Sequence, residues 1–182
     1  IIGENAEDEL AILREDDALE PIAATPAEGV AEAMFNLASF LPRDRAGSVI
    51  LLYTRIALDL KPDFPLAQIL VGDVLMGVGR YDDAVVAYRT VTENSRHSWL
   101  ARIRIADALY ELERIDEAIA LLREMAEGRP ERTDALVRIG DYLRYKERFT
   151  EAVEAYDAAV ERIPEIEQRH WVLLYSRGIA LE

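Results

Sequence analysis

The chain of 182 residues contains no cysteine and only two histidines. The lack of cysteine excludes disulfides, thiolate metal sites and a cysteine nucleophile. No run of 18 apolar residues occurs, so the sequence predicts no membrane-inserted helix. Lysine is also scarce, since Lys61 and Lys146 stand beside 19 arginines. Together with abundant alanine, this bias indicates a GC-rich bacterial genome.

The formal net charge is −14, which disfavours nucleic acids and anionic membranes as partners. Residues 1–20 carry half of this excess, with eight acidic side chains against one arginine. We expect residues 1–30 to form an acidic N-terminal segment, either a solvated terminus or a helix of a preceding repeat, with Asn5 as its cap and Leu10 and Leu13 facing inward. No signal peptide is visible. Because the chain begins at Ile1, we expect it to be a piece of a longer protein, and the compartment stays open between bacterial cytoplasm and periplasm.

A period of 34 residues runs through the chain. Ala84, Ala118 and Ala152 are spaced by this interval, and each follows a bulky apolar residue and two polar ones. A second small residue recurs twelve positions before each alanine, as Gly72, Ala106 and Gly140. Prolines in the same register are Pro62, Pro130 and Pro164. A fixed period of this length indicates a solenoid, in which each unit buries its apolar face against its neighbours.

Each unit is predicted to contain two helices, because a turn such as Gly77-Val78-Gly79-Arg80 separates the two small residues. The pattern closely resembles the tetratricopeptide repeat, which has small residues at its eighth and twentieth positions, large residues at its seventeenth and twenty-fourth, and a closing proline. The family's favoured tryptophan in the first helix is absent, and Arg96 replaces one closing proline. The resemblance implies an all-α fold, a right-handed α-solenoid of antiparallel helix hairpins.

The register divides the chain into units. We expect regular repeats at 65–98, 99–132 and 133–166, a degenerate repeat at 31–64, and an insertion with the first helix of a truncated repeat at 167–182. In the degenerate unit, Ile50 replaces a small residue, and residues 42–47 are expected to form an atypical inter-helix segment. Its first helix is predicted to start at Thr25-Pro26-Ala27-Glu28, which combines a cap, a first-turn proline and a glutamate three residues after the cap.

The resemblance also implies that the first helices line a concave face, chiefly through their second, fifth, ninth and twelfth positions. The ninth position is an aspartate in each regular repeat, at Asp73, Asp107 and Asp141. One interpretation is a ladder of carboxylates that orients a basic or amide-rich peptide. The alternative is that Arg104 with Asp107, and Arg138 with Asp141, form only exposed pairs. The predicted partner-binding residues are Ile69, Asp73, Met76, Ile103, Arg104, Asp107, Tyr110, Val137, Arg138, Asp141 and Arg144.

The C-terminal end departs from the register, because Gly178 lies 38 positions after Gly140. Residues 171–182 are predicted to form one first helix, whose apolar side chains would be largely uncovered. These side chains form a predicted end-to-end interface of Trp171, Leu174, Tyr175, Ile179 and Leu181. They would dock another subunit, a second copy of the chain or the rest of a longer array.

Catalytic signals are weak. His97 and His170 have no pairing with a nucleophile or a metal ligand, and Gly77-Val78-Gly79 lacks the lysine and hydroxyl residue of a phosphate loop. The sequence therefore predicts no metal, no cofactor and no enzymatic activity. It favours a non-catalytic scaffold that binds a protein or peptide on its concave face. The alternatives are an assembly element acting through the C-terminal helix and the regulatory repeat region of a larger enzyme.

Overall fold

The computed structural model describes residues 23–182, so the predicted helix around Asn5 lies outside the described residues. The described part consists of α-helices, one short 3-10 helix and connecting turns, without strands. The elements are α2 Pro26–Ser39, α3 Arg43–Leu60, α4 Pro65–Gly77, α5 Tyr81–Tyr88, α6 Ser98–Glu111, α7 Ile115–Gly128, α8 Asp134–Tyr145, α9 Phe149–Glu161, η1 Gln168–His170 and α10 Trp171–Leu181.

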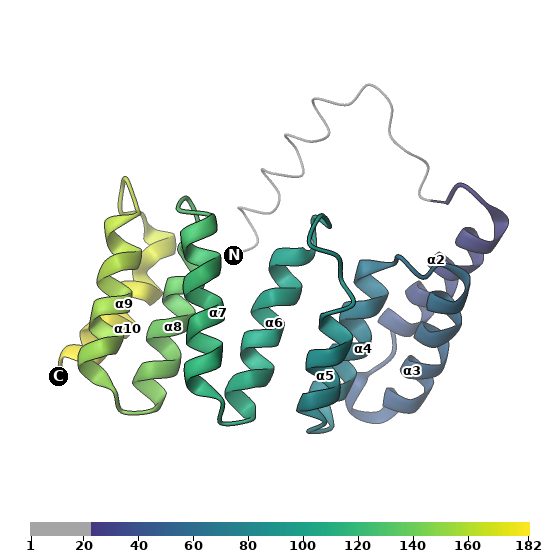
Figure 1. Cartoon of the computed structure of the whole chain (residues 1–182), viewed down its shortest axis with the longest axis horizontal. Helices are drawn as coiled ribbons and strands as arrows, with labels where there is room; N and C mark the ends of the chain where they lie inside the picture. The colour runs from purple at the N-terminus through teal and green to yellow at the C-terminus, as the bar shows by residue number, and fades with distance from the viewer. Residues whose placement is uncertain (1–22) are drawn as a thin grey trace.

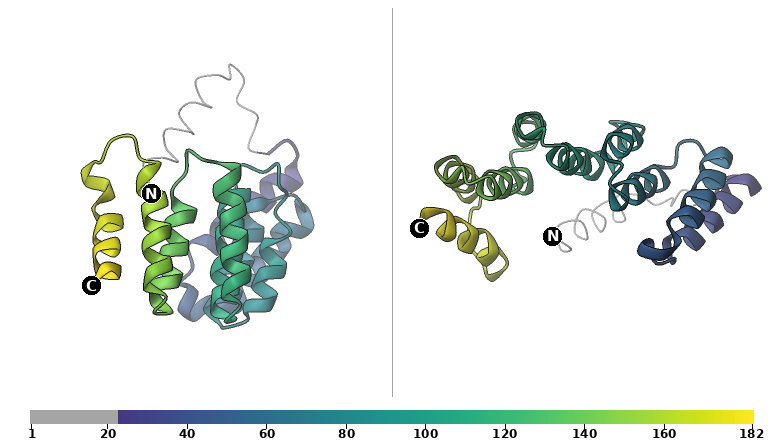
Figure 2. Two further views of the ribbon diagram at one scale, coloured as in Figure 1. Left: turned by 60° about the vertical axis from the view of Figure 1, so that its left-hand side comes forward. Right: turned by 90° about the horizontal axis from the view of Figure 1, so that it is seen from below.

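Consecutive helices form hairpins that stand side by side in a curved row (Figure 1). Viewed along the helix axes, α4, α6 and α8 lie on the inner side of the curve, and α5, α7 and α9 lie on the outer side (Figure 2). Each helix packs mainly against its neighbours in the chain, as expected when repeats contact only adjacent repeats. The predicted α-solenoid is therefore confirmed.

Two tyrosine–glycine contacts fix the distance between the helices of a hairpin. The ring of Tyr88 on α5 covers Gly72 on α4 so closely that a Cβ atom added to Gly72 would lie 2.3 Å from it. Tyr156 on α9 covers Gly140 on α8 in the same way, with a corresponding distance of 2.4 Å. The middle hairpin has alanine and leucine, both fully buried, at the two equivalent positions. The larger side chain, tyrosine, thus stands 16 positions after glycine, and the smaller one, leucine, stands 16 positions after alanine.

The turns inside the three regular hairpins share one backbone conformation. Gly79, Glu113 and Glu147 occupy equivalent positions and have φ angles of 74°, 58° and 58°. In each turn the next residue is an arginine whose N–H donates a 2.9 Å bond to the carbonyl five residues earlier. This is the Schellman arrangement that ends a helix. Glycine adopts this φ without steric cost, whereas the two glutamates do not.

The first hairpin begins as predicted. Thr25 caps α2, with its Oγ1 accepting a 3.2 Å bond from the backbone N–H of Glu28. The segment 42–47, predicted to be an atypical inter-helix segment, overlaps the beginning of α3 at Arg43. The backbone N–H of Ala46 bonds back to Pro42 at 3.0 Å, which closes a helical turn, and the non-helical φ and ψ of Ala46 then kink the helix.

The outer helix α5 is much shorter than its equivalents α7 and α9. It ends at Tyr88, before a run of β-branched residues that have low helix propensity. Thr90 supports this end, because its hydroxyl donates a 2.7 Å bond to the carbonyl of Ala87. An irregular segment, residues 89–97, then leads to α6 and passes through the position where a closing proline is missing.

Candidate partner-binding face

All eleven predicted partner-binding residues belong to α4, α6 and α8, the helices on the inner side of the curve (Figure 2). Their exposure differs. Ile69 and Ile103 are 5% and 7% exposed and belong to the core beneath the face. Met76, Tyr110 and Val137 are half-buried, as are the aspartates and arginines. The surface available to a partner is therefore polar with scattered apolar side chains.

The carboxylate of Asp73 already has hydrogen-bond and ion-pair partners within the protein. Its Oδ1 accepts a 2.9 Å hydrogen bond from the hydroxyl of Tyr88, and its Oδ2 accepts a 3.2 Å bond from Arg43. The Nε of Arg104 lies 3.5 Å from Oδ1. The carboxylate side chain is only 13% exposed. Burial and the adjacent negative charge of Asp73 raise the pKa of Tyr88 well above its usual range.

Asp107 is satisfied differently, because Leu122 provides no hydroxyl at the position held by Tyr88 and Tyr156 in the neighbouring hairpins. Its Oδ1 accepts a 2.6 Å bond from Tyr142 and a 2.8 Å bond from Arg138, both on α8. The predicted pairing of Arg138 with Asp141 is therefore wrong, since the guanidinium reaches back to the preceding inner helix. The predicted pairing within α6 is present, with Arg104 lying 3.7 Å from Asp107. Burial and the charge of Asp107 raise the pKa of Tyr142 far above its usual value.

Asp141 is the most exposed aspartate of the three, at 34%. It accepts a 2.8 Å bond from the hydroxyl of Tyr156, which in turn accepts a 3.3 Å bond from Nε of Arg144. Burial, supported by Asp141 and opposed by Arg144, raises the pKa of Tyr156 to about 12. The three aspartates thus act as acceptors for buried tyrosine hydroxyls at every step of the array.

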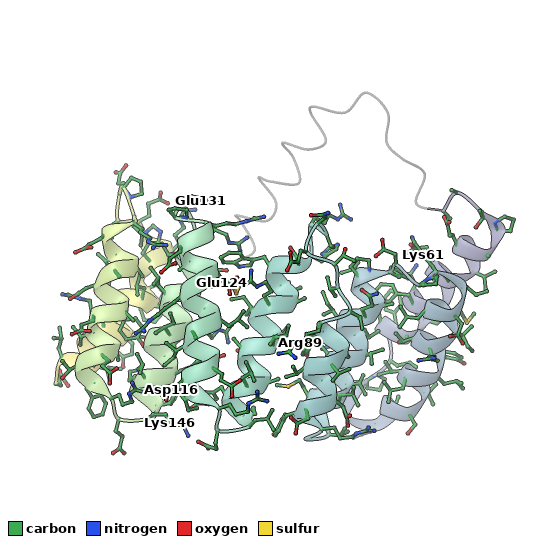
Figure 3. The ribbon with its side chains drawn as sticks, viewed as in Figure 1. Lys61, Arg89, Asp116, Glu124, Glu131 and Lys146 are labelled. Atoms are coloured by element: carbon green, nitrogen blue, oxygen red, sulfur yellow. The ribbon has the colours of Figure 1, made fainter. Side chains whose placement is uncertain are left out.

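An aromatic pair lies between the last two inner helices. Tyr110 on α6 stacks on Tyr142 on α8, with ring centroids 4.4 Å apart. Lys146 lies 5.3 Å from the centroid of Tyr110 and 2.5 Å from a carboxylate oxygen of Glu113. Lys146 marks the lower edge of the molecule in Figure 3. This cluster fixes the spacing of α6 and α8 at the turn end of the face.

Sequence reasoning missed four residues that hold this face together, namely Arg43, Tyr88, Tyr142 and Tyr156. A signal existed for two of them, because glycine precedes tyrosine by 16 residues in two repeats, whereas alanine precedes leucine in the third. Arg43 and Tyr142 carry no comparable signal. Arg43 lies outside the regular repeats, and Tyr142 has no equivalent in the other two.

The C-terminal helix α10 exposes the apolar side chains that were predicted to be uncovered. Trp171 and Tyr175 are both 60% exposed, and their ring centroids lie 5.9 Å apart. Leu174, Ile179 and Leu181 are also exposed. A Cβ atom added to Gly178 would meet nothing within 4 Å, in contrast to the covered glycines of α4 and α8.

A hollow of about 380 Å³ lies on the outer side, between the short helix α5, α6 and α7. Its lining includes Ile105 and Leu121, and Arg102 forms a 2.8 Å ion pair with Glu124 at its rim. Arg89 and Glu124 stand on either side of α6 in Figure 3. None of the predicted site residues lines this hollow.

Within 23–182, no three acidic or histidine side chains are placed to hold a metal ion. His170 is structural, because its Nδ1 accepts a 2.9 Å bond from the backbone N–H of Glu167. In the same part of the chain, no helix combines the length and apolar character needed to cross a bilayer.

Several solved structures are similar to this chain. A structure described as MamA 41-end from Desulfovibrio magneticus RS-1 aligns with a TM-score of 0.61 and 19% identity, over 87% of this chain and 92% of its own. YrrB, described as a TPR protein with an unusual peptide-binding site, aligns with a TM-score of 0.55 and 21% identity, over 87% and 83%. The Cut9–Hcn1 complex of APC/C aligns with a TM-score of 0.63 and 14% identity, over 85% and 30%. At these identities the likeness shows the fold alone.

Among curated proteins, none matches this sequence. A tetratricopeptide repeat model matches residues 69–133 and 104–167, which together span more than half of the chain. These ranges include α6, α8 and most of α4. The chain therefore belongs to the tetratricopeptide repeat family.

Proposed function

We propose that the chain is a non-catalytic scaffold that binds a partner protein or peptide on the inner face of α4, α6 and α8. The observation that carries this proposal is that hydrogen bonds from tyrosine hydroxyls hold the carboxylates of this face in place. Tyr88, Tyr142 and Tyr156 anchor its carboxylates from the core, and half-exposed side chains such as Met76 and Val137 lie among them. A preformed surface loses little entropy of ordering when a partner binds.

The sequence predicts a more specific form of this proposal, in which the aspartates orient a basic or amide-rich peptide. A ligand cation would then compete with the arginines and tyrosines that already contact the same oxygens. Asp141 is the carboxylate that such a ligand would reach first, because it is more exposed than Asp73 and Asp107.

A matched pair of surface variants tests the inner face. Leu100 on α6 and Val86 on α5 are exposed aliphatic side chains on inner and outer helices, respectively. Leu100→Asp and Val86→Asp make the same kind of change on an inner and on an outer helix. Partners are captured from a bacterial lysate, identified by mass spectrometry, and their affinities are measured with purified components.

We expect Leu100→Asp to weaken binding of the purified partner at least tenfold and Val86→Asp to leave the affinity unchanged. Unchanged affinity for Leu100→Asp, with the fold confirmed by circular dichroism, would contradict binding at the inner face.

A second candidate function is assembly through α10. Its support is that Gly178 occupies the same repeat position as Gly72 and Gly140 but is uncovered, next to the exposed rings of Trp171 and Tyr175. A docking helix would place an aromatic side chain over Gly178, as Tyr156 does over Gly140.

Sedimentation velocity of the wild type and of Tyr175→Glu, over a range of concentrations, tests self-association through α10. We expect association in the wild type that Tyr175→Glu abolishes and Val86→Glu preserves. A monomeric wild type at every concentration would rule out a second copy as the docking partner.

A further inference from the structure

We infer that the inner face selects a protein segment rich in carboxylates, rather than a basic one. This inference rests on the proposed binding at the inner face and specifies the chemistry of the ligand. It concerns a set of five residues that we call the arginine row, Arg43, Asp73, Arg104, Asp107 and Arg138.

The first argument is that the two carboxylates of the arginine row are largely buried and already have hydrogen-bond and ion-pair partners within the protein. Both oxygens of Asp73 have partners, from Tyr88 and Arg104 on one side and from Arg43 on the other. Asp107 has three partners, Tyr142, Arg138 and Arg104. At 13% and 15% exposure, neither carboxylate is open to a cation from solvent.

The second argument is that the guanidinium groups of the arginine row remain open. The side chains of Arg43, Arg104 and Arg138 are 60%, 41% and 40% exposed. A guanidinium has five N–H donors. Arg43 and Arg138 each use one in a hydrogen bond, and Arg104 makes only ion pairs at 3.5 and 3.7 Å. The Nε of Arg104 is buried. The three side chains are nevertheless partly exposed, so their outer donors can bind carboxylates of a partner, which guanidinium groups bind in bidentate geometry.

The third argument is the local charge. The arginine row has three positive groups and two negative ones, in a chain whose formal net charge is −14. At its turn end, Lys146 and Glu113 neutralise each other. A local positive stripe on an acidic protein attracts acidic segments and repels basic ones.

Geometry specifies the spacing of the partner's charges. Arg104 and Arg138 occupy the same position in consecutive repeats, and each reaches the aspartate of the preceding inner helix. Helices in direct contact lie about 8–10 Å apart, whereas the inner helices α4, α6 and α8 pack mainly against the outer helices between them. Since an extended chain rises about 3.3 Å per residue, carboxylates at least three residues apart on an extended peptide match successive arginines.

Three labelled peptides of the form (X-Ser-Leu)4, with Glu, Gln or Lys at X, test the inference by fluorescence anisotropy with the full chain. We expect the Glu peptide to bind at least tenfold more tightly than the Gln peptide, and the difference to shrink as NaCl is raised. The Lys peptide should bind more weakly than both. Equal affinity for Glu and Gln peptides, or preference for Lys, would overturn the inference.

The variant Arg104→Gln/Arg138→Gln should abolish the preference for the Glu peptide. The control Arg55→Gln/Arg123→Gln makes the same change in net charge at exposed sites on α3 and α7. Arg43→Gln is a milder variant of the row and should reduce the preference severalfold without disturbing Asp107. If Leu100→Asp weakens all three peptides while the arginine variants bind like wild type, the proposed face is right and the acidic ligand is wrong.

Discussion

Tyr88 and Asp73 are joined by a 2.9 Å hydrogen bond that connects the core of a hairpin to its inner surface. The ring of the tyrosine covers Gly72, and its hydroxyl reaches the carboxylate that follows that glycine in sequence. Tyr156 and Asp141 repeat the arrangement at 2.8 Å. The residues that set the distance between two helices therefore also fix the charges of the candidate binding face.

Gly72→Ala is expected to destabilise the fold by about 1–3 kcal/mol, because its Cβ would lie 2.3 Å from the ring of Tyr88. The midpoint of urea unfolding, followed by circular dichroism, measures the change. Gly178→Ala is the matched control, because it lies at the same repeat position in α10 and meets nothing within 4 Å. The control should gain stability by roughly 0.5–1 kcal/mol from helix propensity.

A double-mutant cycle separates crowding from other effects of Gly72→Ala. Gly72→Ala/Tyr88→Leu reproduces the pair that nature uses in the middle hairpin, Ala106 and Leu122. The two changes together should cost less than the sum of their separate costs. If the two costs simply add, contact with the ring of Tyr88 is not the cause of the destabilisation by Gly72→Ala.

Asp107→Asn should destabilise the fold by about 2 kcal/mol, because it removes a charged acceptor from Tyr142 and Arg138. Asp116→Asn, at a residue labelled in Figure 3, is the control, since that carboxylate is 92% exposed and pairs only at the surface. The control should change stability by less than about 0.5 kcal/mol. Equal effects of the two changes on the urea midpoint would contradict a structural role for Asp107.

Stability should fall at alkaline pH in a way that depends on Tyr156. Its pKa is about 12 in the folded chain, against about 10 in an unfolded one. The stabilisation from the raised pKa is complete below pH ~10 and is lost as pH rises to ~12. Over this range the wild type should lose about 1 kcal/mol per pH unit relative to Tyr156→Phe. The comparison of urea midpoints cancels the titration of other residues, and a constant difference between the two proteins would contradict the prediction.

Glu147→Gly should stabilise the turn between α8 and α9 by roughly 0.5–1 kcal/mol, because the glutamate has a φ of 58°. Glu113→Gly relieves the same φ but also removes the 2.5 Å contact with Lys146. Its gain in thermal midpoint should therefore be smaller. A loss of stability for Glu147→Gly would show that the left-handed conformation is not strained.

Local features of the array could be predicted from sequence. The helix start at Thr25, the covered glycines and the exposed face of α10 all depend on residues close together in one unit. The early end of α5 was not predicted, although the β-branched residues after Tyr88 and the missing proline at Arg96 were visible. The kink at Ala46 could not be predicted, because no regular repeat provides a register for that segment.

The sequence by itself determined the repeat, since a 34-residue period of small and large residues indicates units that bury their apolar faces against one another. It also determined that an aspartate stands at the same position of each regular repeat. Only the tertiary structure decided the partners of those aspartates. Arg138 contacts Asp107 rather than Asp141. The hydroxyl that bonds to Asp107 comes from Tyr142 in the next hairpin, because the hairpin of Asp107 has Leu122 at the position of the bonding tyrosine. These contacts join different repeats, so they depend on how one hairpin is set against the next, which spacing within a repeat does not specify.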